Sequence, residues 1–298
     1  MARRQDSVLA AALAGSMAAG VLLPKAGLVL APYLLVWLGG LLFFNLLRLE
    51  AKDVVATFSK PRRLAATAVI KLAALPLLMY AVAYVLYRPF ALPVLLLSGI
   101  STGLGAPFVA NIVGARLALI VGMIVVTSLA APFTLPALTY LLAGSQFQIP
   151  ILNMITLLAA ALFIPLAAGW AAKKHLPRLS GFADRNSFPM SIVFVVLINF
   201  AMFAQFSAYF FSDQIFLIQT IATSFLCFGA YALAGYLAGS ISSGDLRQER
   251  LSGLISMTHV NNVLVSVFAG QFFGTQVAAL AALYNIPYYV GILLIRLL

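Results

Sequence analysis

Few residues of this sequence could take part in chemistry, because long apolar runs separate its polar side chains. The chain has two histidines, one cysteine and no acidic residue inside an apolar run. These residues cannot supply a nucleophile with its base or a cluster of metal ligands, so we predict no enzyme, no metal site and no cofactor. The single cysteine, Cys227, excludes an internal disulfide.

Two ionisable residues stand inside apolar runs. Lys71 lies nine residues after Arg62, about 13 Å into a hydrocarbon core of about 30 Å. It either extends back along its own helix to the interface or holds a fixed positive charge near the midplane. His259 is also in midspan, and either a structural or a proton-handling role fits it.

Amides and small residues mark two interruptions of the apolar runs. Gly99, Gly103, Gly105 and Pro107 fall within nine residues and should break a helix that begins near residue 90. Asn261 and Asn262 stand at the corresponding place in the second half of the chain. Buried amides need partners in lipid, and irregular backbone there lines a cavity, so both interruptions indicate a binding site.

We therefore predict a substrate site on the two interruptions. Backbone donors can approach an anion at Gly103 and Gly105, where side chains are absent. The other predicted substrate-binding residues are Thr258, His259, Asn261 and Asn262. Thr258 has an alternative partner in its own helix, and Tyr284 and Asn285 are further candidates to line the cavity.

Composition identifies the elements that must position these residues. Of 298 residues, 63% are hydrophobic and 8% are charged, and the mean hydropathy is +1.07. A soluble core with a wet surface does not reach such values, so the chain is an all-α multi-pass membrane protein. We predict ten spans, near 7–24, 28–47, 62–87, 90–112, 116–143, 151–171, 187–211, 214–240, 250–271 and 275–295.

The net charge of +11 is a topology signal and does not indicate nucleic acid. Fifteen of the 18 basic residues fall in segments that a cytoplasmic N-terminus places inside, among them a loop from Lys173 to Arg185. Only Lys25 and Arg88 fall outside. We expect both termini on the cytoplasmic side of the inner membrane, with the first apolar run as a span and not a secretory signal.

The two halves of the chain correspond at an offset of 155 residues. Ile100-Ser101 falls on Ile255-Ser256, Ala106-Pro107 on Asn261-Asn262, and Pro132 on Pro287. Five spans in each half would make residues 1–149 and 150–298 two repeats of opposite orientation. Paired interrupted helices in such repeats are typical of secondary transporters.

Several segments resemble the bile acid:sodium symporter family. The resemblance rests on Leu49, Asp53, Phe58, Lys60-Pro61 and Pro76-Leu77, then on the glycine-rich break, Ala118-Leu119, Pro132 and Pro136, and last on Asn261-Asn262 for the family's Gln-Asn pair. It implies two inverted repeats, a panel domain from spans 1, 2, 6 and 7, and a core domain from spans 3–5 and 8–10 in which the broken spans 4 and 9 cross. It also implies alternating access to an organic anion near that crossing.

The departures from the family bear on coupling. The family's sodium ligands fall on Ala106-Pro107, Ile120, Ile124 and Met257, and its third-span glutamine falls on Lys71. We expect a sodium-independent carrier of a small organic carboxylate, in which Lys71 replaces a sodium ion and either exchanges a proton or stays charged. A sodium-coupled symporter, a channel and a non-transporting sensor on the same fold stay open. The fourth span lacks the cysteine of related arsenite permeases.

Overall fold

The computed structural model describes residues 2–48, 58, 61–103, 105–144, 150–241 and 245–295. Every regular element in these ranges is a helix. Leu49, Asp53 and Lys60, which carry part of the family resemblance, lie outside the described residues.

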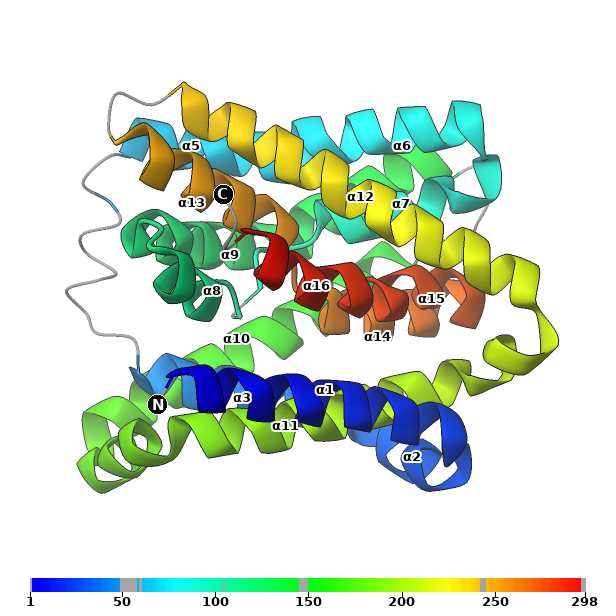
Figure 1. Cartoon of the computed structure of the whole chain (residues 1–298). Coiled ribbons are helices and arrows are strands. Elements are labelled where there is room, and N and C mark those ends of the chain that lie inside the picture. The colour runs from blue at the N-terminus through cyan, green and yellow to red at the C-terminus, as the bar shows by residue number, and fades with distance from the viewer. Residues whose placement is uncertain are drawn as a thin grey trace. The chain divides into compact units, whose positions relative to one another are not determined.

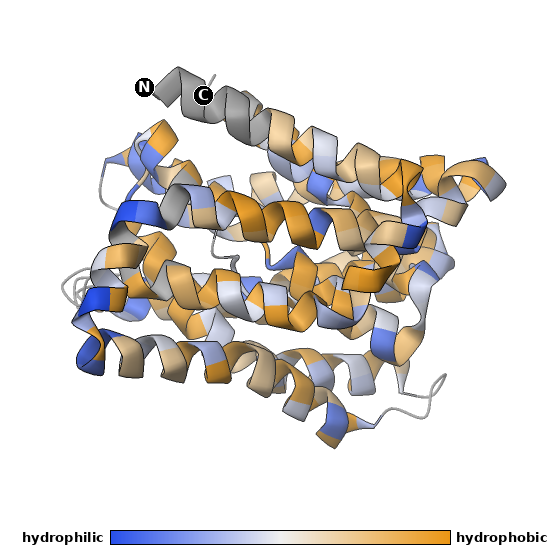
Figure 2. Cartoon of the chain, turned by 90° about the horizontal axis from the view of Figure 1, so that it is seen from below, coloured by the Kyte–Doolittle hydropathy of each residue, from blue (hydrophilic) through white to orange (hydrophobic). Residues whose placement is uncertain are grey.

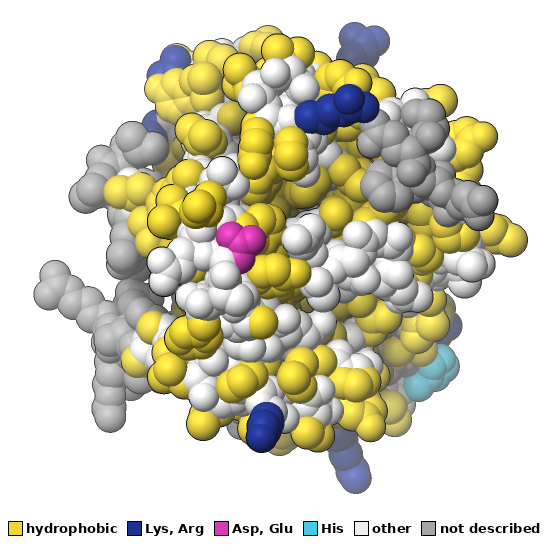
Figure 3. Space-filling view, turned by 90° about the vertical axis from the view of Figure 1, so that its right-hand side faces the viewer, with side chains coloured by type: hydrophobic (Ala, Val, Ile, Leu, Met, Phe, Trp, Pro, Cys, Tyr) yellow, Lys and Arg dark blue, Asp and Glu magenta, His cyan; other side chains and the backbone are white. Residues whose placement is uncertain are grey.

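Six stretches of helix are long and apolar enough to cross a membrane: Pro24–Phe44, Pro61–Leu86, Leu117–Ala143, Ile151–His175, Pro189–Ser212 and Gln214–Ser240. Shorter apolar helices cover Ala11–Leu22, Arg88–Gly99 and Asn262–Phe273. Hydrophobic residues predominate along the helices (Figure 2), and on one face charged side chains stand singly among apolar ones (Figure 3). The chain is thus an α-helical multi-pass membrane protein. The number of ten spans stays a prediction.

The chain divides into two compact units, of which the first comprises Met1–Leu49 and Ala160–Gln219. It contains α1 (Ala2–Leu22), α2 (Pro24–Leu30), η1 (Ala31–Tyr33), α3 (Leu34–Arg48), α11 (Pro177–Ser212) and the later part of α10 (Ile151–His175). Helix α11 contacts both α1 and α3 (Figure 1).

The second unit comprises Glu50–Ala159 and Thr220–Leu298. Its helices are α5 (Pro61–Val69), η2 (Ile70–Ala74), α6 (Leu75–Leu86), η3 (Arg88–Phe90), α7 (Ala91–Gly99), α8 (Ala106–Val113), α9 (Leu117–Ala143), most of α12 (Gln214–Ser240), α13 (Leu246–Thr258), α14 (Asn262–Phe273), α15 (Thr275–Leu283) and α16 (Asn285–Ile295). Helix α13 contacts α8 and α9, and α7 contacts α6, α9, α14 and α15. All predicted site residues belong to this unit.

Two helices differ from the sequence prediction. The loop expected from Lys173 to Arg185 is wrong, because α10 runs to His175 and α11 begins at Pro177. Proline at a first helical position suits a helix start, so polar residues before the apolar run join α11. The expected span 275–295 is divided at Tyr284 into α15 and α16.

Candidate substrate site at the paired helix breaks

Two helices are interrupted, and their interruptions lie against each other. Helix α7 ends at Gly99 and α8 begins at Ala106, while α13 ends at Thr258 and α14 begins at Asn262. Thr102 and Val260 form an antiparallel β-bridge between the two segments. The Gly103 amide donates to the His259 carbonyl at 2.7 Å, and the Asn261 amide donates to the Ser101 carbonyl at 3.0 Å. Backbone groups freed by each break are thus satisfied by the other, as a lipid environment requires.

Side chains from neighbouring helices hold the bridge in place. The Thr102 amide donates to the Thr127 hydroxyl of α9 at 3.0 Å, and the Thr102 hydroxyl donates to the Ser256 carbonyl at 2.8 Å. Tyr284 donates its hydroxyl to the Thr258 carbonyl at 2.8 Å. These groups are buried, so the bridge is a fixed part of the unit.

The two predicted site glycines have different surroundings. A Cβ added at Gly103 would lie 2.7 Å from the Val260 carbonyl oxygen, so glycine is needed for the two backbones to meet. Gly105 is exposed, and a Cβ there would collide only with the end of the Tyr288 side chain. Gly105 is also the N-cap of α8, which has no side-chain cap. It therefore presents an accessible helix N-terminus, whereas Gly103 serves the packing of the breaks.

Lys71 extends its ammonium to the ends of both interrupted helices. Its side chain is 0% exposed, and Nζ donates to the carbonyls of Ser98 in α7 at 3.2 Å and Met257 in α13 at 3.3 Å. Nζ also lies 5.4 Å from the centroid of the Tyr231 ring. Two carbonyls and a π face match the three hydrogens of an ammonium. Lys71 belongs to η2, a π-helical turn of a kind frequent at functional sites.

Thr258 and His259 form a local pair. The Thr258 hydroxyl donates to the Leu254 carbonyl at 2.8 Å and lies 2.9 Å from His259 Nδ1. Because this hydroxyl has only one hydrogen, it must accept from Nδ1, and we assign the imidazole hydrogen to Nδ1. His259 Nε2 is then a buried acceptor, with no hydrogen-bond partner among the described residues.

The two asparagines differ in function within the fold. Asn261 is the N-cap of α14, and its side-chain oxygen accepts from the Leu264 amide at 3.4 Å. Asn262 Nδ2 donates to Asn285 Oδ1 at 2.7 Å, which ties the start of α14 to α16. Both asparagines are slightly exposed, at 7% and 6%. The structure thus brings Asn285 into the predicted site as the partner of Asn262.

Tyr288 is a site residue that the sequence analysis missed. Its hydroxyl is next to Gly105, and its ring meets the His259 ring edge-on at a centroid distance of 4.6 Å. Tyr284 and Tyr288 are four residues apart and so lie on one face of the chain around α16. The spacing of Tyr288 from Tyr284 and its place three residues after Asn285 could have identified it from the sequence as a residue of the site.

A helical membrane unit in which two broken helices pair their interruptions, with polar side chains gathered at the breaks, has the architecture of a secondary transporter. The comparisons agree with this class. The profile of the Sodium Bile acid symporter family matches residues 35–213, which is more than half of the chain. The chain belongs to that family, and its members are transporters and not enzymes. A search of curated proteins found no match. The family match includes Lys71, Gly103 and Gly105, and it ends before residues 258–262.

Proposed function

We propose that this protein is a sodium-independent secondary carrier for a small organic anion, bound at the N-termini of α8 and α14. The contacts of Lys71 carry this proposal. A helix end has about half an elementary charge, positive at the N-terminus and negative at the C-terminus. The Lys71 ammonium donates to the carbonyls of Ser98 and Met257, and its charge offsets the negative C-terminal ends of α7 and α13. The positive ends of α8 and α14 have no acidic side chain in their first turns, which favours an anion.

The substrate contacts in this proposal are the exposed Gly105 at the start of α8, the side-chain amides of Asn261 and Asn262, and the Tyr288 hydroxyl. His259 and Thr258 lie behind them, and Gly103 holds the breaks together. A carboxylate suits such a set, because a helix N-terminus, amide groups and a hydroxyl all offer hydrogen-bond donors.

Lys71 keeps its charge throughout the cycle in our proposal, so the carrier is a uniporter. The oxygens that accept from Nζ are backbone carbonyls of the fold, and we expect them to keep their contacts with the ammonium when a substrate leaves. A proton-coupled cycle would instead need an ammonium whose surroundings change with each substrate. An imposed pH gradient that drives uptake in the absence of sodium would favour proton coupling.

The finer architecture belongs to the same proposal. We infer ten spans in two inverted repeats, residues 1–149 and 150–298, with both termini cytoplasmic in the cell's inner membrane. The mutual pairing of the two breaks supports the repeat, because equivalent segments of inverted repeats meet at the symmetry axis. The excess of basic residues in alternate connecting segments supports the orientation.

Uptake without sodium is the direct test of the proposed function. Proteoliposomes would be given a panel of labelled acetate, lactate, pyruvate, succinate and benzoate, with sodium present or replaced by choline. We expect saturable uptake of at least one anion, at rates that agree within about twofold in the two media, because Lys71 supplies the cation. A strict sodium requirement would contradict the proposal. Ohmic currents would indicate a channel, and binding without flux would indicate a sensor.

Replacing Asn262 by leucine should separate a ligand contact from a structural one. Both Asn262→Leu and Asn285→Leu remove the bond between the two amides, and each leaves a buried partner unsatisfied at a cost of about 1–3 kcal/mol. Only Asn262→Leu also removes a side-chain amide from the start of α14, where we place the substrate. We expect both variants to unfold at lower temperature, and only Asn262→Leu to lose stabilisation by the best carboxylate of the panel in a thermal-shift assay. Equal stabilisation of both variants by that carboxylate would place the site elsewhere.

A further inference from the structure

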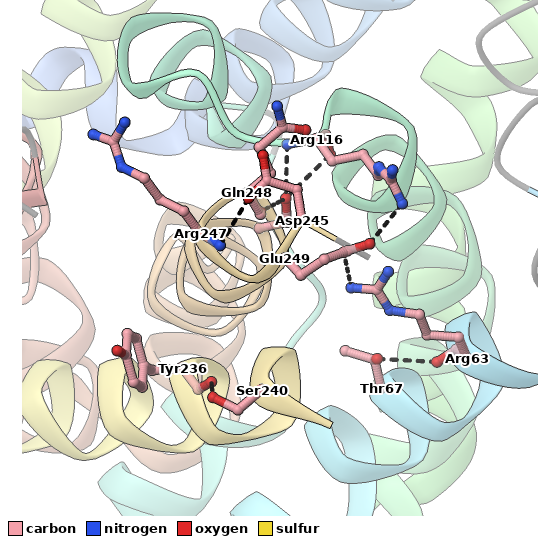
Figure 4. A network of polar contacts seen from close by, with 10 residues as sticks. Arg63, Thr67, Arg116, Tyr236, Ser240, Asp245, Arg247, Gln248 and Glu249 are labelled. Atoms are coloured by element: carbon pink, nitrogen blue, oxygen red, sulfur yellow. Dashed lines mark hydrogen bonds and ion pairs between the residues drawn. The ribbon is translucent and has the colours of Figure 1, made fainter. Parts of the chain in front are cut away.

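A second buried charge lies near the start of α13. Glu249 has a fully buried side chain, whereas Asp213 and Asp245, the other acidic residues whose burial the structure describes, are exposed. Its carboxylate forms ion pairs with Arg63 of α5 and with Arg116, the residue before α9 (Figure 4). The guanidinium of Arg116 is 2.5 Å from Glu249 Oε1, and its backbone amide donates to the Ser252 hydroxyl at 2.7 Å. Glu249 therefore joins α13 to two other helices of the unit.

Two contacts join the same pair of helical stretches: the Arg63–Glu249 ion pair and the Lys71–Met257 hydrogen bond. The residues of these two contacts are the same number of positions apart on each stretch. Arg63 precedes Lys71 by eight residues in Pro61–Leu86, and Glu249 precedes Met257 by eight residues in α13. Eight helical residues rise about 12 Å, so the two stretches run in the same direction and are joined at both ends. A slip of α13 by one residue, about 1.5 Å, would separate both contacts.

Helix α13 meets α12 partly through a close contact between their backbones. Gly235 and Gly239 of α12 face the backbone of α13 at Gly253 and Glu249, so these surfaces meet without interlocking side chains. Close backbone contact of this kind holds helices together. Arg250 of α13 adds a polar contact, because its Nε donates to the Ser240 hydroxyl of α12 at 2.9 Å and its guanidinium lies 4.8 Å from the Tyr236 ring centroid. Glu249 therefore fixes α13 towards α5 and α9, while Arg250 fixes it towards α12.

We propose that Glu249, with Arg63 and Arg116, is a positioning residue for Lys71. The ion pairs set the axial position of α13 against α5 and η2 and so keep the Met257 carbonyl on the ammonium. Glu249 lies in the first turn of α13 and acts on Lys71 through the opposite end of this helix. The inference rests on the proposed function only for the role of Lys71 in transport. The placement of Lys71 itself can be tested without a substrate.

Lysine labelling measures that placement. The purified full-length protein in detergent would be treated with succinimidyl acetate, and acetylation of each lysine followed by peptide mass spectrometry. Lys71 should be protected in the parent protein, because its side chain is fully buried. Glu249→Gln and Arg63→Gln should each raise its acetylation rate at least tenfold, with Lys25, Lys173 and Lys174 unchanged. Arg63→Lys keeps the charge and should keep most of the protection.

Two controls separate positioning from general stability. Asp245→Asn changes another acid at the start of α13 that has no ion pair with α5 and should leave Lys71 protected. Leu280→Ala removes a fully buried side chain of α15 in the same unit, so it should lower the unfolding temperature without changing the ion pairs of Glu249. Equal exposure of Lys71 in Leu280→Ala would overturn the proposal, as would full protection in Glu249→Gln. Arg63→Gln, which leaves Glu249 paired with Arg116, decides the matter if Glu249→Gln does not fold. Failed transport assays would leave these labelling results unaffected.

Discussion

Proteoliposomes that carry Lys71→Met are expected to take up the best carboxylate of the panel at least one hundredfold more slowly than the parent. Methionine fills a similar volume but supplies neither a charge nor a donor. The carbonyls of Ser98 and Met257 would then meet without a cation between them. Each carbonyl is at a helix C-terminus, which carries about half a negative charge, so their repulsion should open the paired breaks.

The initial rate of uptake measures this effect, after correction for the amount of protein in the vesicles. Lys174→Met is the matched control, because Lys174 belongs to the other unit, where its ammonium lies over the Trp170 ring. Lys71→Arg keeps a charge that is not readily released and should retain uptake, with a loss of about tenfold from its larger head. Full activity of Lys71→Met would refute the role assigned to Lys71.

Gly103→Ala is expected to lower the free energy of unfolding of the second unit by several times more than a methyl group added in open space. The added Cβ would lie 2.7 Å from the Val260 carbonyl oxygen and 2.9 Å from its carbon, and backbone at a bridge cannot move aside. Separation of the segments would weaken the bonds from Gly103 to His259 and from Asn261 to Ser101. Overpacking costs about 1–3 kcal/mol, and each buried bond lost adds about 1 kcal/mol.

Thermal unfolding of the purified variants tests this expectation. Gly229→Ala is the control for adding a methyl group to a helix of the unit, since no atom lies within 4 Å of its Cβ position. The unfolding temperature of Gly105→Ala should lie between those of Gly103→Ala and Gly229→Ala, because its added methyl group meets only the movable end of the Tyr288 side chain. We expect Gly105→Ala to affect ligand binding more than stability. Unfolding temperatures that agree for Gly103→Ala and Gly229→Ala would show that the breaks tolerate separation.

The helix interruptions and their composition were predictable because they depend on local chemistry. Glycines weaken a helix and Pro107 suits a first helical turn, and the structure ends α7 at Gly99 and starts α8 at Ala106. Asn261 likewise stands where α13 has ended and α14 begins. The extent of α11 was not predictable from hydropathy, because its first residues are polar and only Pro177 indicates the start.

The partners of the polar residues depended on the tertiary structure. The position of Lys71 within an apolar helix was predictable from the sequence, because a run of 18 or more apolar residues forms a helix that spans the membrane. The sequence left two destinations open for the ammonium, because a flexible side chain can extend along its own helix or across to another. In the folded protein the ammonium reaches across to the carbonyls of Ser98 and Met257, which are 27 and 186 residues away in the sequence. Tyr288 and Glu249 acquire their contacts in the same way, from residues that only the packing of distant helices brings together.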